Sequence, residues 1–266
     1  MEEFFERGGR KLMNNKKKDK RLRIMTHMVA YYPDREESKK IAESLLENGA
    51  HILEVQFPFS DPTADGKYIE MACTAAIKEG FTIKKGFEII KEISKSYRND
   101  IFIMSYANLA FFHGIDRWVK DAKESGVTGL IIPDLPFDYD EGLYEMGKSV
   151  GINIIPVITP DISNKRLEII MEIAPRYIYT TLRRGITGSI TDIDIETIKF
   201  LEKLNSNSKT RILAGFGIYS RSQIETVSDL VYAVVVGSAF IKAINKCTGK
   251  PPHIAVAEKL KELIGK

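Results

Sequence analysis

The chain has 266 residues, of which 44% are hydrophobic and 28% are charged, so it holds enough apolar material for one large core. No apolar run approaches the roughly 18 residues of a membrane-spanning helix, and the charged N-terminus lacks the apolar segment of a secretory signal peptide. Its two cysteines, Cys73 and Cys247, lie far apart without a CxxC pattern, which argues against a thiolate zinc site and fits a reducing, cytoplasmic compartment.

Positive charge is concentrated at the N-terminus. The net charge is +3, but residues 1–23 alone hold nine Lys or Arg and four acids, and the rest of the chain is slightly acidic. Such a cluster could touch nucleic acid or a membrane, yet its basic residues have no aromatic residues between them. We expect residues 1–22 to form a solvated basic arm with at most a short helix near residues 4–12, binding neither nucleic acid nor membrane.

From Arg23 onward, short apolar runs rich in β-branched residues alternate with longer amphipathic runs. Strands are expected at residues 23–30, 51–57, 101–106, 129–133, 152–158, 177–181, 211–215 and 232–237. Helices are expected at residues 36–48, 69–96 with a break near Gly80, 115–125, 139–150, 165–173, 195–204, 220–227, 239–245 and 254–264. Asp194 and Ser220 stand where a side-chain oxygen would cap a helix N-terminus.

Strands separated by helices predict parallel pairing through right-handed crossovers. Eight such units could make a doubly wound sheet or a closed barrel. Eight is the number that closes around a packed interior, and no GxGxxG follows the first strand. The sequence therefore predicts an α/β fold, a single-domain (β/α)8 TIM barrel over residues 23–266 with an extra N-terminal segment.

An acid interrupts the second strand, in the stretch HILEVQFPFSDPTADGKYIE (51–70). Glu54 could be a structural acid paired with a distant base, or a general acid/base whose protonation is tuned by burial. Asp61 and Asp65 are ordinary turn formers, yet both follow the C-terminal end of this strand, where such barrels hold their active sites. The stretch therefore predicts a carboxylate site at the barrel mouth.

Glycines gather at the ends of the last strands, in AGFG (214–217) and VGSA (236–239). They could simply permit tight turns or close helix packing. However, loops after the seventh and eighth strands that lead into a helix N-terminus form a recurrent phosphate site in this fold. Gly217, Gly237 and Ser238 are its candidates, and Gly188 could contribute from LRRGITGSITD (182–192), a loop long enough to act as a lid.

Other chemistries find little support. The four histidines form no HxH or HExxH pattern, so no metal site is expected. No serine lies in a GxSxG elbow, and the strands contain no lysine for a Schiff base.

The stretch LEVQFPFSDPTADG (53–66) resembles the signature of the tryptophan synthase α subunit family. The similarity continues in order through MSYANLAFFHGI (104–115), PDLP (133–136), YIYTTLRRGITG (177–188), GFGI (215–218) and VVGSAF (235–240). It covers nearly the whole chain from about residue 25. The resemblance implies a barrel lyase of tryptophan biosynthesis.

The implied reaction is the retro-aldol cleavage of indole-3-glycerol phosphate to indole and glyceraldehyde 3-phosphate, without cofactor or metal. By resemblance, Glu54 is the acid/base, and Asp65 accepts the indole N–H. Residues expected around the indole and in the lid are Tyr179, Tyr106, Met104, Ile131, Phe216 and Thr187. Those expected around the phosphate are Gly188, Gly217, Gly237 and Ser238.

The implied partner is the β subunit, which carries pyridoxal phosphate, in an α2β2 complex. Asp61, Pro62 and Asn108 resemble the surface that faces it. Two alternatives stay open: a free-standing indole-producing lyase, and a weakly catalytic scaffold that activates a β subunit. The sequence departs from the family pattern at Gln56, where glycine is usual, and at His27, where an apolar pocket residue is usual.

Overall fold

The computed structural model describes residues 22–174, 176–182, 193–206, 210–215 and 217–266. The predicted arm over residues 1–22 thus lies almost wholly outside the described residues, as does the expected helix near residues 4–12.

Nine parallel strands of the described chain form one sheet in the order β5-β4-β3-β2-β1-β9-β8-β7-β6. The strands are β1 (Ile24–Val29), β2 (Ile52–Gln56), β3 (Asp100–Met104), β4 (Gly129–Ile131), β5 (Asn153–Ile155), β6 (Val157–Ile158), β7 (Tyr177–Thr181), β8 (Arg211–Gly215) and β9 (Ala233–Val236).

The two ends of this order, β5 and β6, belong to one run of chain interrupted by Pro156, which has no N–H to donate to a neighbouring strand. The Pro156 carbonyl accepts a hydrogen bond from the Tyr179 N–H at 3.0 Å. The run therefore joins β4 on one side to β7 on the other and closes the barrel. The predicted (β/α)8 barrel is confirmed, and each expected strand is present, the fifth in two pieces.

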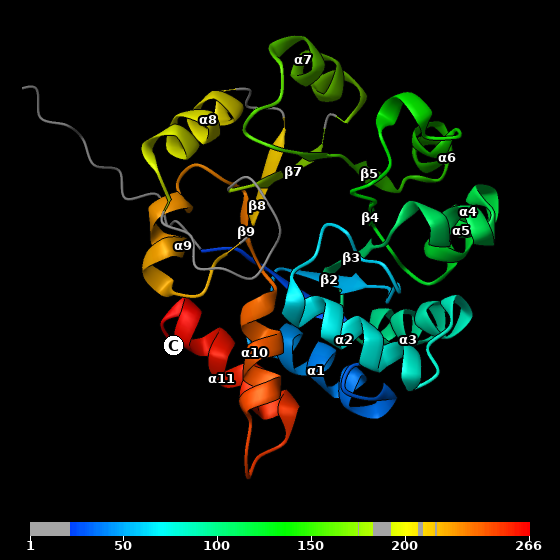
Figure 1. The fold of residues 1–266 in the computed structure, drawn as a ribbon, viewed down its shortest axis with the longest axis vertical. Coiled ribbons are helices and arrows are strands. Elements are labelled where there is room, and N and C mark those ends of the chain that lie inside the picture. Colours follow the sequence, from blue (N-terminus) through cyan, green and yellow to red (C-terminus); the bar gives the residue numbers. More distant parts are fainter. Residues whose placement is uncertain (1–21, 175, 183–192, 207–209, 216) are drawn as a thin grey trace, which may run out of the picture.

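Helices surround the strands (Figure 1). They are α1 (Arg35–Glu47), α2 (Lys67–Lys78), α3 (Ile83–Ser96), α4 (Ala107–His113), α5 (Ile115–Glu124), α6 (Leu143–Val150), α7 (Asn164–Ile173), α8 (Ile195–Asn205), α9 (Arg221–Val227), α10 (Ser238–Lys246) and α11 (Pro252–Ile264), with a 3-10 turn, η1, at Phe137–Tyr139. The expected break near Gly80 separates α2 from α3. Asp194 and Ser220 cap α8 and α9 as predicted, each accepting a hydrogen bond from the backbone N–H three residues on.

Two expectations about helices were wrong. No helix was expected between residues 106 and 115, but α4 begins at Ala107, whose N–H donates to Asp134 Oδ1 at 2.9 Å. The helix expected at residues 139–150 begins only at Leu143. Before it, Glu141 and Gly142 both have positive φ, 51° and 83°, which no helix accommodates.

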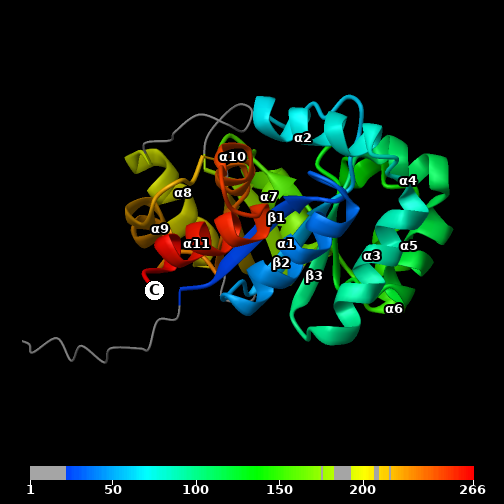
Figure 2. The same cartoon turned by 90° about the horizontal axis from the view of Figure 1, so that it is seen from below.

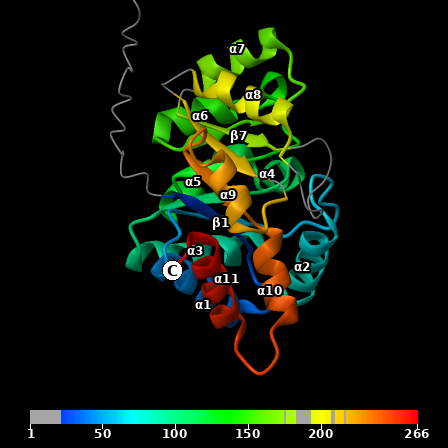
Figure 3. The same ribbon diagram turned by 90° about the vertical axis from the view of Figure 1, so that its left-hand side faces the viewer.

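The C-terminal helix closes the ring of helices. Helix α11 packs against α1 and α10, so the last unit of the barrel lies beside the first (Figures 2 and 3). Across the α1–α11 contact, Ser44 Oγ donates to the His253 carbonyl at 2.8 Å, and the His253 backbone N–H donates to Glu37 Oε1 at 2.8 Å.

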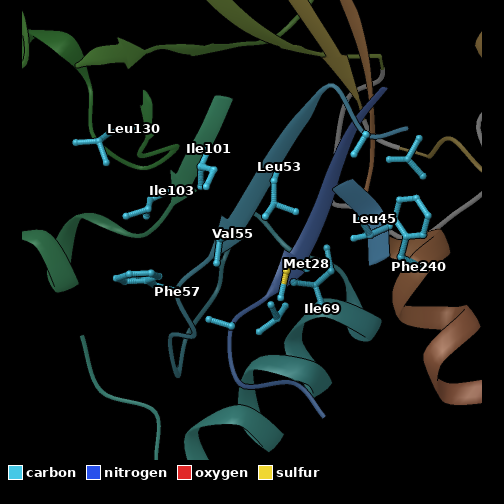
Figure 4. Packing of buried hydrophobic residues seen from close by; sticks show 14 of the residues in the cluster. Met28, Leu45, Leu53, Val55, Phe57, Ile69, Ile101, Ile103, Leu130 and Phe240 are labelled. Atoms are coloured by element: carbon cyan, nitrogen blue, oxygen red, sulfur yellow. The ribbon is translucent and has the colours of Figure 1, made fainter. Parts of the chain in front are cut away.

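Two apolar clusters follow the alternation of side chains along the strands. The larger one lies between strands and helices; Figure 4 shows Leu53 and Val55 of β2, with Ile101 and Ile103 of β3, in this layer. The smaller one fills the barrel interior and includes Ile52, Phe102, Met104, Tyr177 and Tyr179. Glu54 and Gln56 alternate with Leu53 and Val55, so they share the inward face of Ile52. No helix of the described residues is long and apolar enough to cross a membrane.

Candidate active site

A cavity opens at the C-terminal ends of the strands, the end at which this fold holds its active sites. Eight of the predicted site residues line it: Glu54, Asp65, Met104, Ile131, Tyr179, Gly217, Gly237 and Ser238. Three others, Phe216, Thr187 and Gly188, lie outside the described residues. Tyr106 reaches the site through a hydrogen bond to Asp65.

Glu54 lies on β2 directly opposite His27 of β1, and both side chains are buried. His27 Nδ1 is 3.2 Å from Glu54 Oε2, close enough for an ion pair, although the geometry leaves this oxygen without a hydrogen-bond partner in the described chain. Burial by itself would lower the pKa of His27, but the neighbouring charge of Glu54, helped by that of Asp65, outweighs it and raises the His27 pKa. The register of β1 with β2 therefore places an imidazole with a raised pKa beside the buried Glu54 side chain.

Asp65 follows β2 in the turn that leads into α2 and is partly exposed. Its Oδ2 accepts two hydrogen bonds, from Gln56 Nε2 at 2.6 Å and from the Tyr106 hydroxyl at 2.8 Å. Burial raises the pKa of the Asp65 carboxyl, whereas the charge on His27 and these two hydrogen bonds lower it, and the net shift is upward. The two carboxylates thus differ in partner: an imidazole for Glu54, neutral donors for Asp65.

Apolar and aromatic side chains form the remaining wall. Met104 and Ile131 come from neighbouring strands, and Tyr179 comes from β7, on the other side of the β5–β6 run from β4. Burial and the charges of Glu54 and Asp65 raise the pKa of the Tyr179 hydroxyl well above its usual value, so it stays protonated. A Cβ at Gly215 would lie 2.8 Å from this hydroxyl, which explains the glycine by close packing rather than by a turn.

The opposite wall is made where β8 and β9 end. Gly217 has φ +85°, a conformation that disfavours other residues, and Gly237 precedes α10. Ser238, the first residue of α10, exchanges a hydrogen bond of 2.7 Å with the Tyr219 hydroxyl. Free N–H groups of a helix N-terminus next to glycines suit an oxyanion.

Sequence reasoning missed part of the lining. Ile69, Pro133, Val157, Ile218 and Val235 also face the cavity, as does His27. Val235 could have been found, because it lies two residues before Gly237 on the same face of its strand. In the described part of the chain, no group of three or more His, Cys, Asp or Glu side chains could hold a metal ion.

The residues expected to face a partner lie outside the cavity. Asp61 is exposed and Pro62 is buried, in the turn after β2. Asn108 is exposed in the first turn of α4, a helix that was not expected. On the same helix, Phe112 is 88% exposed, which is unusual for a large apolar side chain.

Comparison with known proteins agrees with this architecture. The family model described as tryptophan synthase alpha chain matches residues 13–265. The tryptophan synthase alpha chain of Helicobacter hepaticus is 40% identical over 229 residues, covering 84% of this chain and 86% of that protein. The alpha chain of Methanocaldococcus jannaschii is 34% identical over 236 residues, covering 87% and 84% respectively.

Solved structures give the same result. The chain superimposes on a mutant tryptophan synthase alpha subunit of Pyrococcus furiosus with a TM-score of 0.84 at 27% identity, covering 92% of this chain and 98% of that one. A chain of Mycobacterium tuberculosis tryptophan synthase matches with a TM-score of 0.84 at 25% identity, covering 92% of both. From the family model and these relatives, the chain belongs to the tryptophan synthase alpha chain family, the lyases that cleave indole-3-glycerol phosphate in tryptophan biosynthesis.

Proposed function

We propose that Glu54 and Asp65 carry the cleavage of indole-3-glycerol phosphate and that they divide its chemistry between them. The observation that carries this assignment is that both carboxylates line one cavity at the barrel mouth but have different partners, His27 for one and Gln56 with Tyr106 for the other. Two acids in unlike environments can hold unlike protonation states during one reaction.

Glu54 moves the protons. The bond that breaks joins C3 of the indole ring to the first carbon of the glycerol chain, and this carbon bears a hydroxyl. Glu54 helps to protonate C3 and takes the hydroxyl proton as the carbonyl of glyceraldehyde 3-phosphate forms, so the electron pair of the broken bond returns to the indole ring. The inward position of Glu54 on β2 supports this role, because a rigid strand holds a base accurately.

Asp65 stabilises the charge that this protonation creates. Once C3 is protonated, positive charge develops on the ring nitrogen, and a carboxylate that accepts the N–H stabilises that state more than the neutral substrate. The apolar wall strengthens this interaction by excluding water. We assign that wall to Met104, Ile131, Tyr106, Tyr179 and Phe216.

The far wall holds the phosphate. Gly217, Gly237 and Ser238, with Gly188 from the loop after β7, are the proposed cradle, and Thr187 belongs to the loop that closes over the substrate. The glycines and the N-terminus of α10 support this assignment, because backbone N–H groups can approach phosphate oxygens closely there. Anchoring the phosphate would hold the glycerol carbon near Glu54.

We infer that the chain works with a tryptophan synthase β subunit in an α2β2 complex. A structure described as the tryptophan synthase α2β2 complex of P. furiosus contains a chain that matches this one with a TM-score of 0.83. Asp61, Pro62 and Asn108 belong to the proposed contact surface, and the exposed Phe112 on the same helix as Asn108 supports an apolar contact there. The chain itself would need no cofactor and would act in the cytoplasm, while pyridoxal phosphate would belong to the β subunit.

One assay tests the function and its two alternatives. The purified chain is given indole-3-glycerol phosphate alone and then with the β subunit, and indole or tryptophan is measured. We expect slow cleavage alone and faster cleavage with the partner. Fast cleavage that the partner does not change would indicate a free-standing lyase. No cleavage, together with activation of the β subunit, would indicate a scaffold and would contradict the assignments of Glu54 and Asp65.

A further inference from the structure

Gln56 is the last residue of β2 and points into the barrel mouth, two residues after Glu54 on the same face. Its side chain is completely buried. A buried amide at the end of a strand demands hydrogen-bond partners, since burial without them is unfavourable. The partners of Gln56 therefore indicate why the residue is there.

The amide nitrogen of Gln56 has one strong partner. Gln56 Nε2 donates to Asp65 Oδ2 at 2.6 Å, and it lies 3.5 Å from Cys73 Sγ, a weak acceptor. An ionised carboxylate can only accept hydrogen bonds, so the contact with Asp65 also determines which end of the amide is the nitrogen. Short bonds to an ionised acceptor are stronger than neutral ones.

Tyr106 donates to the same carboxylate oxygen, with its hydroxyl 2.8 Å from Asp65 Oδ2. The same hydroxyl accepts a hydrogen bond from the Ala64 N–H at 3.1 Å, which fixes its orientation. Two donors therefore meet at Oδ2. Asp65 Oδ1 receives no hydrogen bond from the part of the chain that the structure describes, so this oxygen is left for a donor on a ligand.

The other end of the Gln56 amide lacks such a partner. Gln56 Oε1 is buried without a hydrogen bond to any described residue. A buried carbonyl oxygen without a donor destabilises the folded protein. A methionine would occupy nearly the same volume without this defect, so stability alone does not account for glutamine at this position.

We propose that Gln56 is a positioning residue for Asp65: together with Tyr106 it holds Oδ2, so that Oδ1 faces the indole N–H of the substrate. This inference rests on the proposed role of Asp65 in the cleavage. It adds a residue from the β2 strand to the machinery that orients the carboxylate. Gln56 acts only through Asp65 and touches no reacting atom.

The decisive variant is Gln56→Met, which keeps the volume and removes the donor. It is assayed with the β subunit bound, and kcat, KM, their pH dependence and the melting temperature are measured. We expect kcat to fall about tenfold with little change in KM, because the lost bond orients a charge that matters in the transition state. We expect the melting temperature to stay the same or rise.

The pH profile gives a second readout. The hydrogen bond from Gln56 lowers the pKa of Asp65, so losing it raises that pKa further. The acid limb of the kcat profile should therefore move to higher pH in Gln56→Met. The same direction is expected for Tyr106→Phe, which removes the other donor to Oδ2 and serves as the alternative if Gln56→Met does not fold.

A double variant distinguishes the positioning role of Gln56 from the role of Asp65 on which it rests. If Gln56 works through Asp65, adding Gln56→Met to Asp65→Asn should lower kcat no further than Asp65→Asn alone. Additive losses, or a Gln56→Met protein with unchanged kcat and pH profile, would overturn the positioning role. Near-normal turnover of Asp65→Asn by itself would instead overturn the role of Asp65.

Discussion

Among the described residues, buried polar groups have partners at the N-terminal end of the barrel and lack them at the C-terminal end. At the N-terminal end, Tyr177 is 1% exposed, its ring packs edge-on against Phe102 with centroids 5.4 Å apart, and its hydroxyl accepts a hydrogen bond of 2.9 Å from Arg211. The guanidinium groups of Arg211 and Arg23 lie 4.5 Å and 4.8 Å from the centroid of the Tyr232 ring. At this end the arginine guanidinium groups therefore contact the tyrosine rings and hydroxyl.

At the C-terminal end, buried polar atoms lack partners. His27 Nε2, Glu54 Oε2 and Gln56 Oε1 are all buried without a hydrogen bond to a described residue. A buried atom with no partner at all among the described residues, such as Gln56 Oε1, costs about 1 to 3 kcal/mol of stability. The contrast indicates that the N-terminal end holds the barrel together, while the mouth gives up stability for a site that is ready to bind.

Replacing a carboxylate at the mouth tests this contrast and should have the largest effect. We expect Glu54→Gln and Asp65→Asn each to lower kcat by at least about 100-fold, because each removes a group that acts in the transition state. The melting temperature of Glu54→Gln should fall only at low pH, where the variant loses the charge interaction with His27. That of Asp65→Asn should stay close to wild type, because the amide oxygen can still accept from Gln56 and Tyr106. Steady-state assays and thermal unfolding of the purified variants measure both quantities.

Near-normal turnover in either variant would refute its assigned role. A large drop in melting temperature at pH 9 would refute the contrast itself, because it would mean that the mouth carboxylates stabilise the fold independently of His27. Wild-type circular dichroism spectra from both variants are the control for correct folding.

The opposite outcome is expected at the other end of the barrel. Tyr177→Ala should lower the free energy of unfolding by about 3 kcal/mol, since it empties the packing between Phe102 and Tyr232. Turnover per folded molecule should be unchanged. Urea unfolding and active-site-normalised kcat measure the two. Tyr177→Phe is the matched control: it keeps the ring, loses only the hydroxyl, and should cost about 1 kcal/mol.

Local sequence predicts which residues face the interior better than it predicts which residues meet. An acid within the apolar second strand, close to its C-terminal end, was sufficient to expect Glu54 at the barrel mouth. Its partner was not expected, because His27 lies on a different strand and meets Glu54 only through the register of β1 with β2. Contacts of this kind depend on strand pairing, which no short window of sequence contains.

The same limit applies to the elements themselves. Gly80 gave the break between α2 and α3, and Pro156 explains the divided fifth strand. Helix α4 was missed because it has only seven residues, and a tertiary contact, Asp134 with the Ala107 N–H, holds its first turn. Local propensity predicts long amphipathic helices far better than such short ones.

His27 at the mouth should make the stability of the protein depend on pH. Burial lowers the pKa of His27, but Glu54 and Asp65 together outweigh burial, so the pKa is raised in the folded protein. A raised pKa stabilises the fold fully below the unfolded value of 6.5, and this contribution is lost as pH rises through the folded value. His27→Phe removes the contribution together with the unpaired Nε2 atom.

We therefore expect the stability of wild type relative to His27→Phe to be greatest near pH 5 and to decline as pH rises above 7. Urea unfolding of both proteins between pH 5 and pH 9 measures this difference. A difference that does not change with pH would mean that His27 stays neutral beside Glu54. His253→Phe is the control for an imidazole–carboxylate pair outside the mouth, because the half-buried His253 pairs with Glu37 between α1 and α11.

The smallest expected effect lies outside the cavity, at Asp61. Its side chain is exposed and accepts a hydrogen bond only from the neighbouring Ser60 hydroxyl among the described residues, at 2.6 Å. The turn itself is made by backbone groups: the Thr63 N–H donates to the Asp61 carbonyl, and the Asp65 N–H donates to the Pro62 carbonyl, both at 2.9 Å. Asp61→Ala therefore keeps the turn and removes only a surface charge.

Basal cleavage by Asp61→Ala should accordingly stay within about twofold of wild type, since a surface charge contributes little to the fold or to the chemistry. Activation by the β subunit should fall several-fold if Asp61 contacts it. Glu79→Ala, at the far end of α2, removes a charge from another exposed site and should change neither rate. Equal losses of basal and activated rates in Asp61→Ala would mean that the residue acts on Asp65 through the turn, and the division between mouth and partner surface would then be wrong.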